Sequence, residues 1–301
     1  MGYKLAGFSV LGGVEIDKKM ADVYSKNHSP KYLYNLGISD FNKLKQKEIP
    51  KELYSLDVLD GSPPCSSFSV SGSREKKWGE DTYFREGQEK QILDNLFFDF
   101  LETTKKLKPK VVIAENVKGI LMGKAKGYVK EILRSFEQLG YGVQIFVLNA
   151  SRMGVPQTRE RVFFIANNID KKIELNFNEK VIPLSEAFKG CESNGKALYK
   201  SLAVDYERIR AGKAQKYFNT IISSPNHPAS TLTAKNRKGA CEVHWEKRFF
   251  SDSEIIRIQT FPDDYNFLGQ DAAYICGMSV PPFMMQRLAL EISRQFFNKR
   301  E

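Results

Sequence analysis

The sequence predicts an α/β protein in which a mostly parallel sheet carries helices on both faces, joined to a smaller irregular domain. Between residues 8 and 165, short β-branched runs alternate with segments that repeat apolar residues at helical spacing. Such alternation is typical of a parallel sheet covered by helices. From residue 167 to about 246 the runs shorten, glycine and proline interrupt them, and helical periodicity returns after residue 252. We therefore expect a core domain of residues 1–166 and 247–301, and a second domain of residues 167–246.

The expected elements of the core domain follow in order. Residues 3–7 read as the tail of a helix and residues 8–14 as a strand. Residues 53–59 form an apolar run that reads as a buried strand ending at Asp60-Gly61. The remaining elements are a helix over 91–107 stopped by Pro109, a strand over 111–114, a helix over 129–139, strands over 143–148 and 162–166, and a closing helix over 283–297.

The segment Gly61-Ser-Pro-Pro-Cys-Ser-Ser-Phe-Ser69 places a thiol on a stiff turn behind a predicted strand. Two prolines fix φ just before Cys65 and restrict the residue ahead of them. The carboxyl ends of strands are where open α/β sheets carry their chemistry. A lone cysteine is more often a small buried hydrophobe, so Cys65 becomes a candidate nucleophile only through its neighbours.

Two further segments provide those neighbours. Lys110-Val-Val-Ile-Ala-Glu-Asn-Val117 is a buried strand that ends in a carboxylate and an amide. Gln157-Thr-Arg-Glu-Arg-Val162 places Arg159 and Arg161 on the same side if the chain is extended there. Taken alone, Glu115 could simply meet solvent, and the arginines could form an ordinary solvated charge run.

In this order, Pro-Cys, Glu-Asn-Val and Gln-x-Arg-x-Arg resemble motifs of the DNA (cytosine-5)-methyltransferases. Val14-Glu-Ile-Asp17 is similar to the second motif of that family and Ile38-Ser-Asp40 to the third. Residues 257–265 and 277–282 are similar to the ninth and tenth motifs. The resemblance covers nearly the whole chain. It implies a Rossmann-like catalytic domain, with a target-recognition domain at residues 167–246 and a role in restriction–modification.

The resemblance also implies catalytic roles. Cys65 would attack C6 of a cytosine that has been swung out of the duplex, which is nucleophilic catalysis by a thiolate. Glu115 would protonate or hydrogen-bond N3 of that base. Arg159 and Arg161 would position the flipped base and the cysteine loop, and Arg159 is one candidate for the cation that favours the thiolate.

The implied cofactor is S-adenosylmethionine. Glu15 at a strand end is expected to accept hydrogen bonds from ribose hydroxyls, and Asp40 to receive the adenine amino group. The other implied cofactor residues are Ile16, Pro64, Ser279 and Val280. Met278 stands where the tenth motif usually has asparagine, which is expected to loosen the local turn, although Ser279 can still form hydrogen bonds.

The implied partner is double-stranded DNA, and the net charge of +10 fits a polyanion. Residues 72–90 form a polar loop directly after Cys65, and loops of this kind often act as lids. The predicted DNA contacts are Ser67, Arg74, Gln157 and Arg237.

One departure from the family concerns the start of its fold. The family begins with a strand and a Phe-x-Gly-x-Gly-Gly turn, which should precede Glu15 by about 20 residues. Residues 8–13 do not fit that place, because they end two residues before Glu15. We therefore expect the first strand and its glycine turn to be missing. This leaves three explanations open: one half of a split enzyme that needs a separate polypeptide, a non-catalytic DNA-binding chain, or a misplaced start codon.

Other readings are weaker. An RNA cytosine methyltransferase shares the fold, but the Cys-Phe-Thr of its tRNA-directed members does not occur here. No 18-residue apolar run or apolar leader is found, so no membrane span is expected. The four cysteines (65, 191, 241 and 276) lack metal or disulfide spacing, which suggests a reducing cytoplasmic setting, and the three histidines are too scattered for a metal site.

Overall fold

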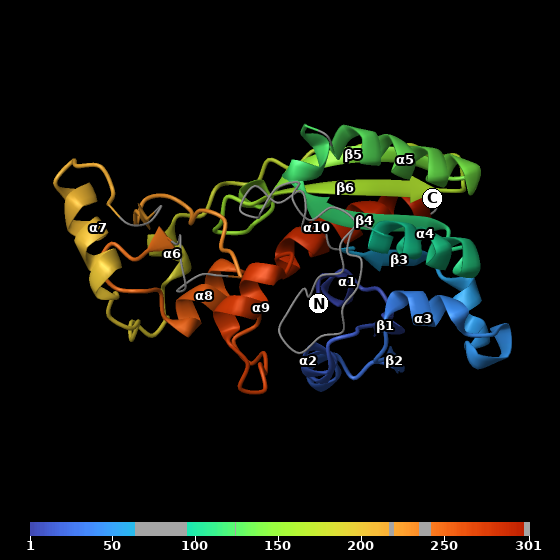
Figure 1. Ribbon diagram of the computed structural model, residues 1–301, viewed down its shortest axis with the longest axis horizontal. Coiled ribbons are helices and arrows are strands. Elements are labelled where there is room, and N and C mark those ends of the chain that lie inside the picture. The colour runs from blue at the N-terminus through green and yellow to red at the C-terminus, as the bar shows by residue number, and fades with distance from the viewer. Residues whose placement is uncertain (64–94, 124, 217–219, 235–241, 298–301) are drawn as a thin grey trace. The chain divides into compact units, whose positions relative to one another are not determined.

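The computed structural model describes residues 1–63, 95–123, 125–216, 220–234 and 242–297 (Figure 1). The chain divides into two compact units. The sheet unit contains Val10–Leu148 and Glu160–Glu174, and the helical unit contains Met1–Ser9, Asn149–Arg159 and Leu175–Glu301. We describe each unit separately.

The main sheet of the sheet unit has the strand order β3-β4-β6-β5. Its strands are β3 (Val58–Gly61), β4 (Val111–Val117), β6 (Glu160–Asn167) and β5 (Gly142–Asn149). β3 runs parallel to β4, whereas β6 runs antiparallel to it. The antiparallel β6 is an exception in a sheet that was predicted to be mostly parallel. The connection from β5 to β6 holds only the 3-10 turn η6 (Ala150–Arg152), too little chain for the helical crossover that a parallel pair requires.

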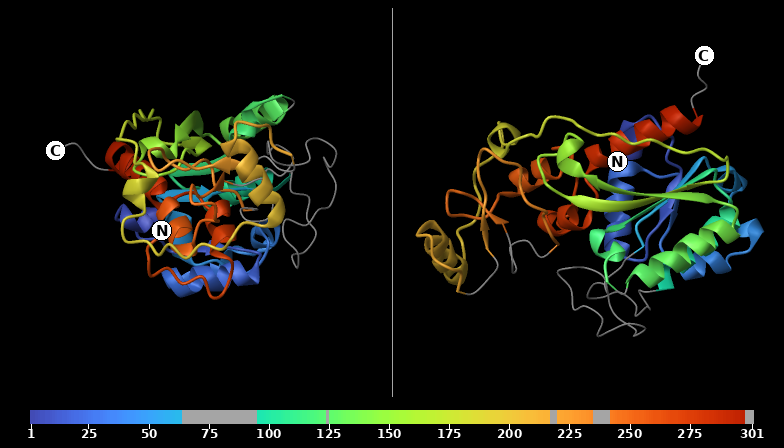
Figure 2. Two further views of the ribbon diagram at one scale, coloured as in Figure 1. Left: turned by 90° about the vertical axis from the view of Figure 1, so that its left-hand side faces the viewer. Right: turned by 90° about the horizontal axis from the view of Figure 1, so that it is seen from above.

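The two central strands of this sheet are buried on both faces, as in other covered α/β sheets. One face packs against α4 (Leu96–Leu107) and α5 (Ala125–Gln138), which lie beside the sheet in Figures 1 and 2. The strand residues in this layer are Val112, Ala114, Val162, Phe164 and Ala166. The alternate residues Val111, Ile113, Phe163 and Ile165 are buried as well. This explains why β4 and β6 read as continuous apolar runs.

A second, two-stranded sheet lies in the same unit. β1 (Gly12–Val14) pairs in parallel with β2 (Tyr32–Tyr34), and α2 (Lys18–His28) connects them. The side chain of Asp17 caps α2 by accepting from the backbone N–H groups of Lys19 and Met20. The elements that follow are α3 (Ile38–Lys43) and the 3-10 turns η1 (Gln46–Glu48) and η2 (Lys51–Ser55), with η5 (Lys118–Leu121) after β4.

The two sheets share an apolar layer but no strand ladder. Leu11 and Val14 at β1 belong to the same cluster as Leu59 of β3 and Leu107 of α4. In the described part of the chain, however, β1 and β3 fall in different sheets. All residues of β1 and three of the four in β3 are half-buried, and the fourth, Asp60, is exposed. A discontinuity therefore separates β1 from β3.

The helical unit is built from short elements. It contains α1 (Gly2–Leu5), α6 (Leu184–Ala187), α7 (Lys200–Arg210), α8 (Asp252–Ile258), α9 (Ala272–Met278), α10 (Pro282–Ile292), the π-helical turn η7 (Ser293–Phe297), and the paired strands β7 (Ile221–Ile222) and β8 (Glu242–Val243). The helix α1 packs on α10 so closely that a Cβ on Gly2 would lie 2.4 Å from Cβ of Met285. No helix in the described ranges is long and apolar enough to cross a membrane.

Three predicted boundaries differ from the structure. The strand expected over residues 53–59 is shorter, because η2 occupies Lys51–Ser55 and β3 begins at Val58. The strand expected over residues 8–14 is limited to Gly12–Val14. Residues 247–301 fall in one compact unit with residues 175–246, not with the core domain. Bonds between the two ranges include that from Oγ of Ser251 to the carbonyl oxygen of Glu192 at 2.7 Å and that from the N–H of Phe249 to the carbonyl oxygen of Lys196 at 2.9 Å.

Candidate active site

The carboxylate at the end of β4 is paired with an arginine at the start of β6. The antiparallel register places Val117 opposite Arg161 and Glu115 opposite Phe163, so Glu115 and Arg161 are diagonal neighbours on one face. Nε of Arg161 lies 3.0 Å from Oε1 of Glu115, and the two side chains are only 13% and 12% exposed. Burial lowers the pKa of Arg161, and the charge of Glu115 opposes that shift. The result is a carboxylate held in one orientation by a desolvated cation.

The neighbouring amide ties this strand end to the turn that precedes Cys65. Nδ2 of the buried Asn116 donates to the carbonyl oxygen of Pro63 at 3.2 Å, and its Oδ1 accepts from the backbone N–H of Val117 at 2.8 Å. The parallel ladder adds the pair Gly61 with Ala114. The start of the Pro-Pro-Cys turn is therefore fixed to the strand that carries Glu115. Sequence reasoning did not single out Asn116, although it belongs to the Glu-Asn-Val motif.

Five of the predicted site residues lie outside the described residues: Pro64, Cys65, Ser67, Arg74 and Arg237. The loop predicted over residues 72–90 lies outside them as well. Their roles remain predictions. The described residue nearest to Cys65 in the sequence is Pro63.

Two predicted cofactor residues, Ile16 and Asp40, come together after β1. A Cβ placed on Gly37 would lie 3.6 Å from Cδ1 of Ile16 and 3.7 Å from Oδ2 of Asp40, so these two side chains converge on one point. Asn35 fixes the backbone there by donating to the carbonyl oxygens of Glu15 at 2.7 Å and Ile16 at 3.2 Å. Burial raises the pKa of Glu15, whose Oε1 accepts from the N–H of Asp17. An aliphatic side chain beside a carboxylate suits a flat ligand that carries an amino group.

The first half of Gln-x-Arg-x-Arg lies in the helical unit and is fully buried. Arg159 donates from Nη1 to the carbonyl oxygen of Leu232 at 2.8 Å and from Nη2 to that of Gly277 at 2.9 Å. Oε1 of Gln157 accepts from the N–H of Leu232, and its Nε2 donates to Gln259. Arg159 and Arg161 therefore bond to different groups. The prediction that Gln157 contacts DNA does not fit this placement, because its side chain is enclosed by protein.

The tenth-motif residues lie at the end of α9 in the same unit. Oγ of Ser279 donates to the carbonyl oxygen of Ile275 at 2.7 Å, and the Ser279 carbonyl accepts from Gln259 at 2.6 Å. Met278 is exposed and Val280 is half-buried. These bonds hold the turn that Met278 was expected to loosen. Gln259, which lies in the segment similar to the ninth motif but was not predicted as a site residue, joins Gln157, ahead of β6, to this turn.

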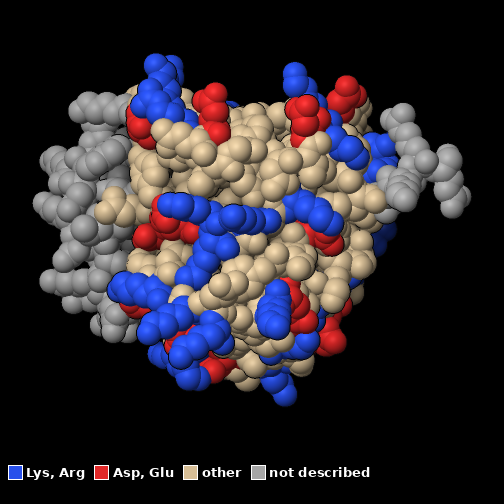
Figure 3. All heavy atoms as spheres, turned by 90° about the vertical axis from the view of Figure 1, so that its right-hand side faces the viewer, with Lys and Arg blue, Asp and Glu red and all other residues tan. Residues whose placement is uncertain are grey.

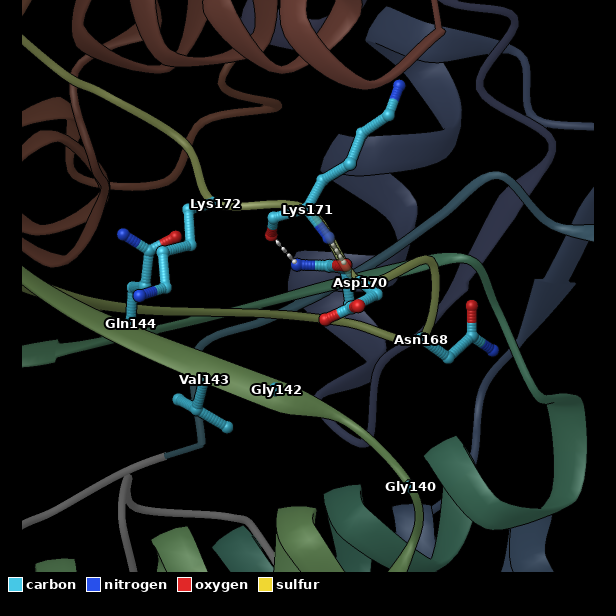
Figure 4. Close-up of a pocket in the computed structure, with 9 residues that line it drawn as sticks. Gly140, Gly142, Val143, Gln144, Asn168, Asp170, Lys171 and Lys172 are labelled. Carbon is cyan, nitrogen blue, oxygen red and sulfur yellow. Dashed lines mark hydrogen bonds between the residues drawn. The ribbon is translucent and has the colours of Figure 1, made fainter.

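A pocket of about 250 Å³ in the sheet unit contains none of the predicted site residues (Figure 4). It is lined by Gly140, Gly142, Val143, Gln144, Asn167, Asn168, Asp170, Lys171 and Lys172. Its amide side chains bond to the backbone of the surrounding loop. Gln144 accepts from the N–H of Ile173, and Asn167 donates to the carbonyl oxygen of Lys171. The pocket is therefore a feature of the loop after β6 and not of the candidate site.

Charge on the surface is mixed. On the face shown in Figure 3, Lys and Arg side chains stand among Asp and Glu side chains. Exposed ion pairs of the protein include Lys43 with Asp40 and Lys110 with Asp57, both at 2.7 Å. Positive charge alone does not locate a DNA interface. Within the described ranges, no group of three or more His, Cys, Asp or Glu side chains is placed to hold a metal ion.

The family model described as C-5 cytosine-specific DNA methylase matches residues 1–189 and 171–294. The chain belongs to this family. The predicted resemblance and the predicted enzyme class, a DNA methyltransferase, are thereby confirmed. The methylase is 28% identical over 350 residues to the type II methyltransferase M.FnuDI of Fusobacterium nucleatum, covering 100% of this chain and 92% of the relative. It is 27% identical over 340 residues to M.NgoPII of Neisseria gonorrhoeae, covering 98% and 92%.

Solved structures show the same fold. A prophage-encoded DNA modification methyltransferase from E. coli superposes on the methylase with a TM-score of 0.74 at 20% identity, covering 99% of this chain and 95% of that one. A DNMT2 protein of Spodoptera frugiperda gives 0.66 at 18% identity, covering 97% and 95%. At these identities the likeness concerns the fold alone, and it confirms the predicted Rossmann-like α/β class.

Proposed function

We propose that this methylase transfers a methyl group from S-adenosylmethionine to C5 of a cytosine swung out of a specific duplex DNA site. The reaction would pass through a covalent bond between Sγ of Cys65 and C6 of the base. The observation that carries the proposal is the anchoring of the Pro-Pro-Cys turn by Asn116, next to the Glu115–Arg161 pair. Because the curated relatives are type II methyltransferases, we extend a restriction–modification setting to this chain.

Cys65 and Glu115 would have different roles in the reaction. The Cys65 thiolate would add to C6, and the ring electrons displaced by that bond would be met at N3 by a proton held on Glu115. Cys65 lies two positions after Pro63 in the sequence, a span of at most about 7 Å. The Asn116 bond to Pro63 therefore limits how far the thiol can lie from β4. Once C5 has taken the methyl group, its proton would pass to water, the thiolate would leave C6, and N3 would return its proton to Glu115.

Arg161 would orient Glu115 without replacing it. With one oxygen bonded to a buried guanidinium, the Glu115 carboxyl group keeps a fixed direction, so that its other oxygen can share a proton with the ring nitrogen. Arg161 would also add positive charge where the ring gains electron density. Both effects follow from the 3.0 Å separation of Nε and Oε1.

The residues behind β1 fit the nucleoside of the cofactor. Ile16 offers apolar contact to a purine ring, Asp40 can accept from its amino group, and Glu15 can accept from ribose hydroxyls. When bound, the cofactor supplies an electrophilic methyl group. The protein residues would bind and orient it and hold the base against it.

A mechanism-based trap tests the proposal. Duplex DNA with 5-fluorocytosine at the target should leave an SDS-stable adduct on the unsubstituted protein when cofactor is present, because fluorine cannot leave as a proton does. Cys65→Ala should form no adduct and still bind duplex DNA. Cys191→Ala is the matched control, a half-buried thiol outside the site, and should behave as the parent. An adduct retained in Cys65→Ala would remove the thiol from its proposed role.

The missing ladder between β1 and β3 favours a second possibility, in which the chain needs an added strand. We infer that one further strand enters between β1 and β3, from the same polypeptide or a separate one. β1 pairs in parallel with β2, and β3 pairs in parallel with β4. The two sheets share an apolar layer, but no ladder connects β1 with β3 in the described residues. Tyr24 borders this discontinuity, since its ring lies 3.9 Å from a Cβ built on Gly13. Burial, and to a smaller extent the charge of Asp60, raises the pKa of Tyr24. Open edges of this kind accept an added strand.

Calorimetry distinguishes the two possibilities. If the added strand and a glycine turn are required, residues 1–301 alone should bind S-adenosylmethionine weakly or not at all, and a segment of about 15–20 residues with strand and glycine-turn character should restore binding. A scrambled peptide of the same composition is the control. Micromolar affinity without any added segment would show that the chain already holds the cofactor and would contradict the inference.

A further inference from the structure

A stretch of chain between β7 and β8 is held against the approach to β6 in the helical unit. The N–H of Ala229 donates to the carbonyl of Pro156 at 3.0 Å, and the N–H of Thr158 donates to the carbonyl of Ala229 at 2.7 Å. Oγ1 of Thr231 adds a bond to the Thr158 carbonyl at 2.8 Å. A parallel bridge joins Gln157 to Ala229. We name residues 229–234 the return segment.

The buried side chains of Gln157 and Arg159 form hydrogen bonds with the backbone of Leu232, at the centre of the return segment. The N–H of Leu232 donates to Oε1 of Gln157 at 3.0 Å, and the carbonyl of Leu232 accepts from Nη1 of Arg159 at 2.8 Å. Both backbone groups of Leu232 are thus bonded by side chains of one motif. The other guanidinium nitrogen, Nη2, reaches the carbonyl of Gly277 at 2.9 Å.

Gly277 packs directly against the backbone of the return segment. A Cβ on Gly277 would lie 2.3 Å from the carbonyl carbon of Thr233 and 2.5 Å from the N of Ala234. The peptide between these two residues therefore rests directly on the glycine backbone. Because Arg159 bonds both Leu232 and Gly277, one guanidinium fixes the distance between the return segment and the end of α9.

The return segment is part of the predicted target-recognition domain, residues 167–246, and a further bond ties it to β8 of that domain. The N–H of Ser230 donates to Oε2 of Glu242 on β8 at 2.6 Å. Gln157 donates to Gln259, which donates in turn to the carbonyl of Ser279. Both amide side chains are fully buried and Arg159 is 1% exposed. A buried guanidinium is costly unless its donors are bonded, so this arrangement specifies one geometry.

We propose that Arg159 is a positioning residue for DNA binding and not a catalytic residue of the methyl transfer. It would hold the return segment in the conformation that the recognition region needs to engage the duplex. This rests on the proposed function. A segment that is already ordered does not have to be ordered on binding, which favours affinity. Arg159 would then act on the affinity for DNA, whereas Arg161 acts on the chemical step.

Steady-state kinetics with the full chain separates the roles. Lysine keeps the charge of Arg159 but lacks the planar fork, so it cannot reproduce the two separate bonds from Nη1 to Leu232 and from Nη2 to Gly277. Arg159→Lys should raise KM for duplex DNA by about tenfold or more with kcat within about threefold of the parent. Arg152→Lys, the same change on the exposed turn η6, should leave both constants unchanged. A lower kcat with unchanged KM, from a catalytic role or from loss of folded enzyme, would overturn the proposal.

A second variant and a second measurement do not depend on turnover. Gly277→Ala leaves every charge in place but pushes on Thr233 and Ala234, and should raise KM in the same way. In both variants, amide hydrogen exchange at Ala229 and Leu232 should accelerate while the amides of β4 keep their rates. Absence of methyl transfer by the parent would count against the proposed function alone, and affinity for duplex DNA would then replace KM. Unchanged exchange at Ala229 and Leu232 in both variants would overturn this inference.

Discussion

Replacing Glu115 by glutamine should slow methyl transfer far more than it weakens the fold. The amide keeps an acceptor for Nε of Arg161, 3.0 Å away, but it carries no charge and cannot deliver a proton to N3. Arg161 would then be a buried cation with a neutral partner, a change worth about 1–3 kcal/mol in free energy of unfolding. Loss of a preorganised donor in a reacting site costs about 2.7–4 kcal/mol in barrier, or about 10²–10³ in rate.

The two effects are measured separately. Single-turnover transfer of a tritiated methyl group, with DNA and cofactor saturating, reports the rate, and urea unfolding reports stability. Glu160→Gln is the matched control, because Glu160 lies on β6 and pairs with Lys118 at 2.8 Å, but the two side chains are 42% and 52% exposed. Its stability loss should stay below about 1 kcal/mol. A Glu115→Gln rate within about threefold of the parent would refute the assignment of Glu115.

Three further outcomes are expected. Asn116→Leu removes the bond to Pro63, so it should cost about 1–3 kcal/mol in urea unfolding and slow trapping by 5-fluorocytosine, and an unchanged trapping rate would contradict the anchoring role. Burial raises the pKa of Glu242 from 4.5 to about 7, so the folded protein keeps a proton that the unfolded chain releases. Its contribution to stability, up to about 3 kcal/mol, is present below pH 4.5 and lost as pH rises through about 7, and Glu242→Gln should abolish that part of the pH dependence of urea unfolding. Exchanging residues 167–246 for those of a relative should change the DNA sequence methylated, and a folded chimera that keeps its original target would place recognition elsewhere.

Much of the sheet unit could be predicted because its patterns are local. The apolar runs of β4 and β6 indicate buried strands wherever they occur, and Glu115 stands where one of them ends. The convergence of Ile16 and Asp40 was expected from the resemblance alone, since 24 residues separate them in the sequence. No spacing rule could have brought them together.

The divergence of Arg159 and Arg161 shows where local rules stop. Alternation places residues i and i+2 on one side only while both belong to a strand. β6 begins at Glu160, so Arg159 lies before the strand and takes its direction from Leu232 and Gly277, which are distant in sequence. The antiparallel orientation of β6 likewise depends on the short connection between β5 and β6, which the composition of β6 itself does not reveal.

The pairing of Glu115 with Arg161 also bears on how β6 finds its place during folding. Residues 162–166 are buried on both faces, so sliding β6 by one position along β4 would still bury apolar side chains. Such a slip would bring Glu160 opposite Val117, diagonal to Glu115, and set two carboxylates against each other where the native register sets opposite charges. Burial alone discriminates poorly between these alignments, whereas the electrostatic penalty rejects the shifted one. The Glu115–Arg161 pair, proposed to serve catalysis, would thus also favour the native register of β6 on β4 during folding.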